Sequence, residues 1–409
     1  MELNRVVITG VGTVTPFGKG VEHLMAGIRE GRSAVRYMEE WKEYKGLRTL
    51  VGAPAELKDE KKIPRQKRRS MSPMSIFAVQ AAEEAVADAG LNLRQMPPHR
   101  VGCVVGSTMG SAQSINEFFE KFLPEKDFIE ASAMAFFKAM GHTTAVNVAQ
   151  YFDLSGYVMS PAAACASALQ AIGEGYNMLR LGVQDVILCG GAEELHPTVS
   201  GIFDSLFATS HKYNNEPQKT PRPFDADRDG LVCGEGSGIL VLETYENAVS
   251  RGAPIYAEIS GFNITGDVEH LSRLNEEPMK HCVKEALKEA GVAPGEVDYI
   301  NAHATATLQG DQAEASVLAD IFGNSVPVSS LKGYIGHTLA ASGAIELIAT
   351  LKMMREGVVY PGLNLDNVDP ACRGIYHPQK PVKKELKTIV KNCFAFGGVN
   401  TAMVCKKTD

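Results

Sequence analysis

Short apolar runs rich in β-branched residues alternate with longer stretches of helical periodicity along the whole chain. Seven runs have the length and composition of buried strands or strand ends. They are residues 5–12, 100–107, 185–192, 238–244, 297–304, 326–330 and 388–398. Residues 166–182 and 278–291 instead space their apolar residues as amphipathic helices do. Alternation of strands and helices is typical of buried sheets covered by helices, so the sequence predicts an α/β fold.

A weak internal echo relates the two parts of the chain. In residues 179–194, and again in 288–305, a helix end is followed by an apolar strand and then by a turn that holds glycine or histidine. This echo indicates two related halves, residues 1–250 and 251–409, with the boundary near residue 250. A single mixed α/β chain explains the pattern about as well.

Composition narrows the class of protein. The chain has 409 residues, of which 44% are hydrophobic, so it can bury a large core. A net charge of -7 argues against wholesale binding of nucleic acid. The N-terminus reads as a strand followed by a glycine turn rather than as a signal peptide, and no apolar run is long enough to predict a membrane span. The eight cysteines lack CxxC pairs and zinc-ligand spacing, so we expect reduced, mostly buried thiols in the cytoplasm.

One segment departs from the acidic average. Between Glu56 and Ser70 the chain is dominated by lysine and arginine. The basic residues of interest are Lys62, Arg65, Lys67, Arg68 and Arg69. A solvated helix face explains such a run, and a docking patch for an acidic partner is the sharper alternative.

Cys165 is the strongest candidate for a nucleophile. It lies where the small-residue run SPAAACAS passes into the predicted helix of residues 166–182. At a helix N-terminus, unpaired N–H groups and the helix dipole favour a thiolate. Taken alone, a cysteine at such a junction is more often structural, so the interpretation depends on the residues that accompany it.

Candidate partners for Cys165 follow far downstream. His303 lies in NAHATAT, where Thr305 and Thr307 stand at alternate positions and would point the same way in an extended loop. SSLKGYIGH adds Lys332 and His337. A nucleophilic cysteine needs groups that move protons and stabilise an oxyanion, and these imidazoles and hydroxyls fit that need.

The segment after His337 reads as a helix that carries Glu346. A carboxylate on that helix is a candidate ion-pair partner for a buried Lys332. CFAFGGVN, near the C-terminus, is a glycine-rich turn suited to presenting a backbone N–H to an oxyanion, and Phe396 within it is either core or a movable gate. PRPFDADRDG carries several acids but lacks the remaining ligands of a calcium loop, so we expect a structural turn and no metal site.

Together these segments resemble the β-ketoacyl-acyl carrier protein synthases, specifically the elongating Cys-His-His class of the thiolase superfamily. The shared motifs are ACAS, PRPFDADRDG with the GEGSG that follows it, NAHATAT, KGYIGH and FGGVN, in the family's order along nearly the whole chain. The resemblance implies a thiolase-like fold in which two related α/β halves form a layered αβαβα arrangement. It also implies a dimer and no permanently bound cofactor.

The resemblance implies a role for each motif. Cys165 would take an acyl group from the phosphopantetheine thioester of acyl carrier protein. His303 and His337 would support decarboxylation of malonyl-carrier protein, and Lys332 would set the electrostatics of the site. Backbone N–H groups of Cys165 and Phe396 would form the oxyanion hole, with Phe396 also acting as a gate.

Further residues match supporting positions of the family. Those beside Lys332 are Glu346, Asp311 and Glu314, and those matching the pantetheine arm are Thr305, Thr307 and Ser272. The basic run matches a region that grips the acidic carrier protein, which favours the docking interpretation for Lys62, Arg65, Lys67, Arg68 and Arg69.

Several positions depart from the housekeeping members of the family. Here the chain has Ala304 for glycine, Ala306 for serine, Gly333 for serine, Ala395 for glycine, Val399 for threonine and Phe207 for a carrier-binding arginine. The catalytic set is intact, so these departures favour a specialised type II polyketide or polyene system. In such systems the partner protomer is often a cysteine-less chain-length factor instead of a second copy.

Three alternatives remain. The first is a housekeeping fatty-acid elongation synthase. The second is a degradative thiolase, for which Cys393 is the only plausible second cysteine. The third is a non-catalytic chain-length partner, against which the retained Cys165, His303, Lys332 and His337 argue.

Overall fold

Two sets of five strands form the framework of the protein, a computed structural model that describes residues 3–129, 132–267 and 275–408. The first set is β1 (Val6–Thr15), β5 (Val101–Gly106), β6 (Val158–Met159), β7 (Val186–Glu193) and β8 (Gly236–Thr244). The second set is β9 (Ala257–Gly266), β10 (Tyr299–Asn301), β11 (Val328–Ser329), β14 (Thr388–Ala395) and β15 (Val399–Lys406). Short strands are β2 (Gly18–Lys19), β3 (Arg36–Tyr37), β4 (Val51–Gly52), β12 (Val358–Val359) and β13 (Val382–Lys383).

The two sets repeat one topology. The first runs in the order β1-β8-β7-β5-β6 and the second in the order β9-β15-β14-β10-β11. In each set the first three strands are antiparallel neighbours and the last three are parallel. β1 also pairs with β9, which joins the sets into one continuous sheet. The predicted α/β fold with two related halves is therefore confirmed.

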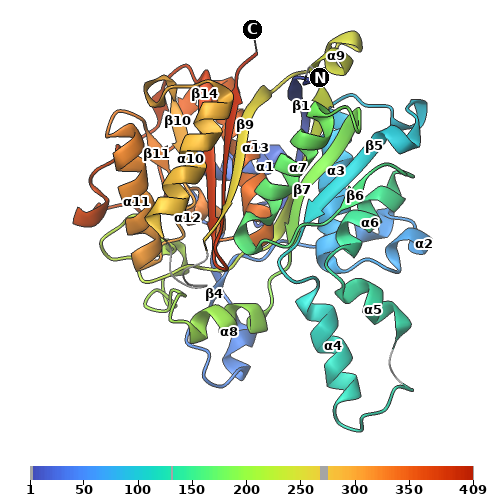
Figure 1. The fold of residues 1–409 in the computed structure, drawn as a ribbon. Coiled ribbons are helices and arrows are strands. Elements are labelled where there is room, and N and C mark those ends of the chain that lie inside the picture. The colour runs from blue at the N-terminus through green and yellow to red at the C-terminus, as the bar shows by residue number, and fades with distance from the viewer. Residues whose placement is uncertain (1–2, 130–131, 268–274, 409) are drawn as a thin grey trace.

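Helices cover both faces of the strands and fill the space between the two sets. They are α1 (Val21–Arg29), α2 (Arg65–Arg68), α3 (Pro73–Asp88), α4 (Ala112–Phe122), α5 (Ala133–Ala139), α6 (Thr143–Tyr151), α7 (Ser167–Arg180), α8 (Pro197–Ser205), α9 (Tyr245–Ser250), α10 (Glu276–Ala290), α11 (Leu308–Phe322), α12 (Lys332–Ile335) and α13 (Ser342–Glu356). Figure 1 shows α10 and α11 outside one set of strands, α7 and α13 between the sets, and α3 and α6 outside the other. Three hydrophobic clusters match these layers.

The two central helices, α7 and α13, have compositions that suit burial between the two sets of strands. α13 buries nearly all of its residues, as expected for a helix enclosed on all sides. α7 packs glycines and alanines against its neighbours; a Cβ on Gly173 would meet the ring of Phe262 at 2.2 Å. Small residues let the middle layer lie close to both sets of strands, and so bring segments from the two halves together.

Two details of the sequence interpretation need correction. The glycines near the N-terminus do not form a turn, because β1 runs straight through them. A Cβ on Gly10 or Gly12 would meet the carbonyl oxygens of Ala85 or Ala81 at 2.2 and 2.0 Å, so these glycines let α3 lie directly on the strand. The echoing segments 179–194 and 288–305 are not equivalent, since the first spans α7–β7 and the second α10–β10.

The prediction of reduced, mostly buried thiols is confirmed. All eight cysteines are free and buried. Within the part of the chain that the structure describes, no helix is long and apolar enough to cross a membrane.

Candidate active site

Cys165 lies in a single helical turn, Ala164–Ala166, directly before α7. This is the junction of small residues and helix that the sequence predicted. Ala164 adopts a left-handed backbone with φ 46°, a strained conformation for a residue with a Cβ. The Ser167 hydroxyl accepts a hydrogen bond from the Ala163 N–H at 2.9 Å, which ties the turn to the helix. The sulfur is thus held on a sharp, fixed corner.

His337 lies against this sulfur. Its Nε2 is 2.9 Å from Cys165 Sγ, and its Nδ1 is 2.9 Å from the Ser342 hydroxyl at the start of α13. Its backbone N–H donates to the Val232 carbonyl at 2.7 Å. With both ring nitrogens and the backbone fixed, the imidazole is already oriented to exchange a proton with the thiol.

His303 completes a cluster of three chemical groups. Its ring lies 5.4 Å from that of His337, nearly perpendicular to it. One side-chain atom from each of Cys165, His303 and His337 falls within 4.8 Å of the others. Residues distant in the sequence therefore share one pocket. A thiol and two imidazoles are also donors that Zn²⁺ accepts, so a chelator control belongs in any assay of this site.

The loop that carries His303 is held by two buried carboxylates on α11. Glu314 accepts the backbone N–H groups of His303 and Ala304 at 2.8 and 2.6 Å. Asp311 accepts those of Ala306 and Phe224 at 3.1 and 2.7 Å. Both acids therefore act by positioning the backbone of this loop.

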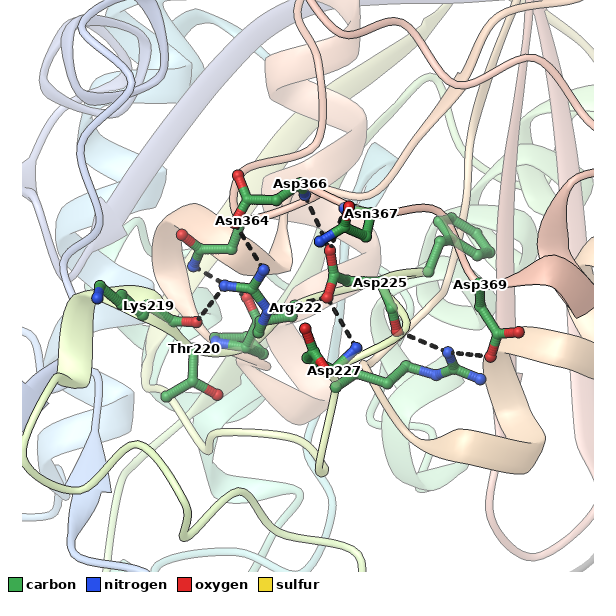
Figure 2. Close-up of polar contacts among 12 residues, drawn as sticks. Lys219, Thr220, Arg222, Asp225, Asp227, Asn364, Asp366, Asn367 and Asp369 are labelled. Carbon is green, nitrogen blue, oxygen red and sulfur yellow. Dashed lines mark hydrogen bonds and ion pairs between the residues drawn. The ribbon is translucent and has the colours of Figure 1, made fainter.

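The PRPFDADRDG segment is a structural turn. Asp225 accepts from Arg222 Nε at 3.1 Å, and from the backbone N–H groups of Asp227, Asp366 and Asn367 at 2.9, 2.8 and 2.8 Å (Figure 2). Donors from the protein itself thus surround this carboxylate. This turn also places the Phe224 N–H where it donates to Asp311, and so helps to hold the loop that carries His303.

Arg228, at the end of the same turn, is fully buried. It pairs with Asp369 at 2.6 Å and donates to the carbonyls of Thr307 and Leu308 at 3.3 and 2.9 Å. These contacts fix the start of α11 and the loop that holds Thr305 and Thr307.

Lys332 faces away from solvent and pairs with Glu346 Oε1 at 2.6 Å, as the sequence predicted. A second lysine, Lys391 of β14, pairs with the other oxygen, Oε2, at 2.5 Å. All three side chains are fully buried. Two ammonium groups thus share one carboxylate behind the histidines.

The buried charges set the protonation of the pocket. The pKa of His303 is held well below its usual range, first by burial and then by the nearby charges of Lys332, His337 and Lys391. Burial and the same lysines do so for His337. Burial raises the pKa of the Cys165 thiol to about 12, and Lys332 opposes that rise. The resting state is a protonated thiol beside neutral imidazoles, which corrects the expectation of a standing thiolate.

A cavity of about 370 Å³ opens onto these groups. Thr305 and Thr307 line it with hydroxyls 3.1 Å apart, consistent with alternate positions on one side of a loop. Phe396 also lines it, half-buried, with its ring 6.1 Å from that of Phe203. Phe207 is 79% exposed at the rim, where the Arg48 guanidinium stacks 4.4 Å from its ring centroid. Ser272 lies outside the described residues.

The basic run forms a short turn and α2. Lys67 donates to the carbonyls of Gln150 and Tyr151 at 2.9 and 2.8 Å, so it ties α2 to the end of α6. Lys62 pairs with Asp59 at 2.9 Å, and Arg68 lies 3.9 Å from Glu60. Arg65 and Arg69 are exposed.

Gly333, one of the departures, has a packing reason. A Cβ at this position would lie 2.5 Å from the Leu363 carbonyl oxygen. We therefore expect Gly333→Ser to lower the free energy of unfolding by about 2 kcal/mol, the cost of overpacking a rigid site. Denaturant unfolding measures it. Gly295→Ser is the control, because among the described residues nothing beyond its own chain neighbours lies within 4 Å of a Cβ there. Equal stability of both variants would contradict the expectation.

Comparison with known proteins identifies the class. A family model described as "Beta-ketoacyl synthase, N-terminal domain" matches residues 3–248, and one described as "Beta-ketoacyl synthase, C-terminal domain" matches residues 256–366. The 3-oxoacyl-[acyl-carrier-protein] synthase 1 of Escherichia coli (strain K12) is 34% identical over 407 residues, 99% of each chain. This chain therefore belongs to the β-ketoacyl synthase family, whose members are condensing enzymes of the acyltransferase class.

Solved structures agree on the fold. A β-ketoacyl synthase from Burkholderia phymatum STM815 superposes with a TM-score of 0.95 and 42% identity, covering 99% of this chain and 100% of that one. A type II PKS acyl-carrier protein complex with its ketosynthase, AntDE:AntF, gives 0.91 and 31%, with both chains fully covered. The thiolase-like architecture expected from the sequence is confirmed.

Two residues of the site were missed from the sequence. Lys391 could have been noticed in the sequence, because it is the charged residue on a strand face that is otherwise apolar. Ile389, Cys393 and Ala395 share that face of β14. Arg228 lay inside a motif that was read only for its acids. In both cases a charge in an apolar or turn segment indicated a buried ion pair.

Proposed function

We propose that this enzyme joins an acyl group carried on Cys165 to malonyl-acyl carrier protein, with loss of carbon dioxide, to give a β-ketoacyl-acyl carrier protein. The observation that carries the proposal is the cluster of Cys165, His303 and His337, whose buried side-chain atoms lie within 4.8 Å of one another at the cavity. Substrates arrive on the phosphopantetheine arm of the carrier, and no permanent cofactor takes part.

In the first half-reaction, Cys165 Sγ attacks the carbonyl carbon of the incoming thioester. His337 Nε2, at 2.9 Å, accepts the thiol proton as the carbon–sulfur bond forms. The resulting oxyanion is held by the backbone N–H groups of Cys165 and Phe396. The carbonyl re-forms, the bond to the pantetheine sulfur breaks, and the leaving thiolate takes the proton back from His337.

In the second half-reaction, malonyl-carrier protein loses its carboxylate as carbon dioxide. The electron pair of the broken carbon–carbon bond moves to the thioester, whose oxygen becomes an enolate held by N–H donors of His303 and His337. The enolate carbon then attacks the acyl carbon on Cys165. The carbon–sulfur bond breaks, and the Cys165 thiolate takes up a proton from solvent through His337.

The rest of the cavity guides the carrier's arm. Thr305 and Thr307 bind its amides, together with Ser272, and Phe396 moves as a gate between the two half-reactions. Glu346, Asp311 and Glu314 hold Lys332 and the histidine loop in place. Support for the gate comes from the glycines after Phe396, Gly397 and Gly398, whose φ angles of 90° and 77° allow a loop conformation closed to other residues.

For the pathway, we propose a specialised type II polyketide or polyene system. The departures at Ala304, Ala306, Ala395 and Phe207 support it, as does the similarity to a ketosynthase of a type II PKS. The similarity to 3-oxoacyl-[acyl-carrier-protein] synthase 1 favours the housekeeping alternative. Assays that compare saturated acyl chains with poly-β-keto intermediates on carrier protein distinguish the two; equal or better use of saturated chains would favour fatty-acid elongation.

Carrier protein is the proposed partner of the basic run. We expect Arg65→Glu with Arg69→Glu to weaken carrier binding about tenfold at low salt, because like charges then face an acidic protein. Calorimetric titration at two salt concentrations measures it, and the loss should shrink as salt screens the charges. Lys67 is left intact because it anchors α2 to α6.

The matched control for docking is Lys288→Glu, a charge reversal of the same kind on α10, on the opposite side of the molecule from α2 (Figure 1). Unchanged binding in the double variant, or an equal loss in the control, would show that the basic run is a solvated surface and not a docking patch.

The enzyme is further proposed to work in the cytoplasm as a dimer, with a second copy or a chain-length-factor-like homologue. Support comes from exposed apolar side chains on and beside α4 and α5, such as Leu123, Phe128 and Phe136, which are 56%, 68% and 65% exposed. Large exposed apolar patches mark protein interfaces. The mass of the complex, measured for the chain alone and with its candidate partners, identifies the second protomer.

A further inference from the structure

The buried charge behind the histidines is unbalanced. Lys332 and Lys391 reach opposite oxygens of Glu346, at 2.6 and 2.5 Å, and all three side chains are inaccessible to solvent. One carboxylate cannot neutralise two ammonium groups, so the trio leaves one positive charge in a region of low dielectric. A buried charge of this kind destabilises the folded state, because its lost hydration is not replaced by an opposite charge.

Lys391 is held in that position by its strand. β14 is buried along its whole length and pairs on both sides, with β10 and β15. The residues on its inner face, Ile389, Cys393 and Ala395, all belong to the central hydrophobic cluster. An apolar side chain would therefore suit this position, and Lys332 alone would satisfy Glu346. The second lysine is not required to complete the ion pair.

The extra positive charge can stabilise the anions that form during the reaction. Condensation forms several anions within one pocket: the oxyanion of acyl transfer, the enolate after decarboxylation, and the thiolate that leaves. A fixed positive charge in a dry pocket stabilises each of them and costs no reorganisation during the reaction. It also disfavours a proton on the imidazoles, which must enter the cycle neutral if His337 is to accept a proton.

We propose that Lys391 is a positioning residue for the condensation. Its ammonium, bound to Glu346 opposite Lys332, supplies the net positive charge that keeps His303 and His337 neutral and favours anions at Cys165. This inference rests on the proposed function for its purpose. The charge balance it describes is a property of the pocket and is testable without any carrier protein.

The other ionisable groups buried around the pocket fit this account. Burial raises the pKa of Glu314 to about 7, so at neutral pH it cancels the extra charge only in part. Burial raises the pKa of Glu193 to about 8, so that it is mainly protonated. Cys393 and Cys165 are buried thiols whose pKa values are raised. Asp311 lies 3.8 Å from its own cation, Arg228.

The test compares variants that change the charge in known steps. Lys391→Met makes the trio neutral, Glu346→Gln gives it two positive charges, and the double variant returns it to one. The first readout is carbethoxylation of His303 and His337 by diethyl pyrocarbonate, followed by peptide mass spectrometry from pH 5.5 to 8, because only neutral imidazole reacts. The second is the pH profile of malonyl-carrier decarboxylation.

We expect Lys391→Met to move the acid limb of both profiles to higher pH. At pH 5.5 the histidines should be modified at least about threefold more slowly than in the unaltered enzyme, relative to each protein's own rate at pH 8. Glu346→Gln should move the limb the other way. The double variant should return toward the original profile, although it has lost two polar side chains. Lys406→Met on the neighbouring strand is the control, since its ammonium bonds the Ala290 carbonyl instead.

A purely structural role predicts something else: lower thermal stability with no shift of either profile, and a double variant no better than the single ones. Either result would overturn the inference. If Lys391→Met fails to fold, the opposite shift of Glu346→Gln still decides it. If the enzyme decarboxylates nothing, the proposed function fails, while the carbethoxylation profile still reports on Lys391.

Discussion

Cys165→Ala is expected to abolish acyl loading. Without the sulfur the proposed nucleophile is lost, and neither imidazole replaces it, because His337 is placed as the proton acceptor and His303 as a donor to the enolate oxygen. The mass increase that follows incubation with acyl-carrier protein should vanish, and overall condensation should fall by at least about a thousandfold. Intact-protein mass spectrometry, followed by peptide mapping of the adduct, measures this.

The matched control is Cys393→Ser, a near-isosteric change at another buried cysteine of the central layer. It should retain the adduct, because Cys393 has no part in the proposed chemistry. An adduct that survives in Cys165→Ala would refute the assignment of the nucleophile. Loss of turnover in Cys393→Ser, with free coenzyme A supporting cleavage of a 3-ketoacyl thioester, would instead revive the degradative alternative with a second catalytic cysteine.

His303→Ala is expected to separate the two half-reactions. His303 does not contact Cys165 through a hydrogen bond as His337 does, so acyl loading should continue. Decarboxylation should slow by about a hundredfold to a thousandfold, because one of the two donors to the enolate oxygen is lost. Release of carbon dioxide from malonyl-carrier protein and the acyl adduct on Cys165 are measured on the same preparation.

His23→Ala controls for the loss of an imidazole elsewhere, on α1 and outside the cavity. It should leave both half-reactions unchanged. A variant at His303 that loses loading and decarboxylation equally would show that this residue maintains the pocket as a whole, and would remove its separate role. Including a chelator in both assays tests whether a bound metal contributes, and the proposal expects no change.

The sequence could predict the class of fold because buried strands and amphipathic helices leave strong local patterns. The start of a helix at Cys165 and the pairing of Lys332 with Glu346 could both be predicted. Small residues before a helix, and a lysine among apolar residues, can each be recognised within a short stretch of sequence. The continuation of β1 through its glycines could not be predicted locally, because its cause is α3, which packs on the strand with Ala81 and Ala85, 69 and 75 residues away from Gly12 and Gly10. Local patterns reveal elements, whereas the contacts between elements decide the details.

The electrostatics were the least predictable part of the site. The sequence favoured a thiolate at Cys165 from its helix position, but burial outweighs that influence and raises the pKa of the thiol to about 12. Burial depends on the closed layers around α7 and α13, which no local window contains. Lys391 escaped notice for the same reason: its partner, Glu346, is 45 residues away along the chain.

The distance between Cys165 and His337 along the chain also shapes how the enzyme is made. The two residues are 172 positions apart, and β1 must pair with β9 before the layers around them are complete. At about 5–20 residues per second, a ribosome releases the thiol roughly 10–30 seconds before its proton acceptor. During that interval the nascent polypeptide has a cysteine but no means of activating it. Reactivity is therefore withheld until synthesis is nearly finished.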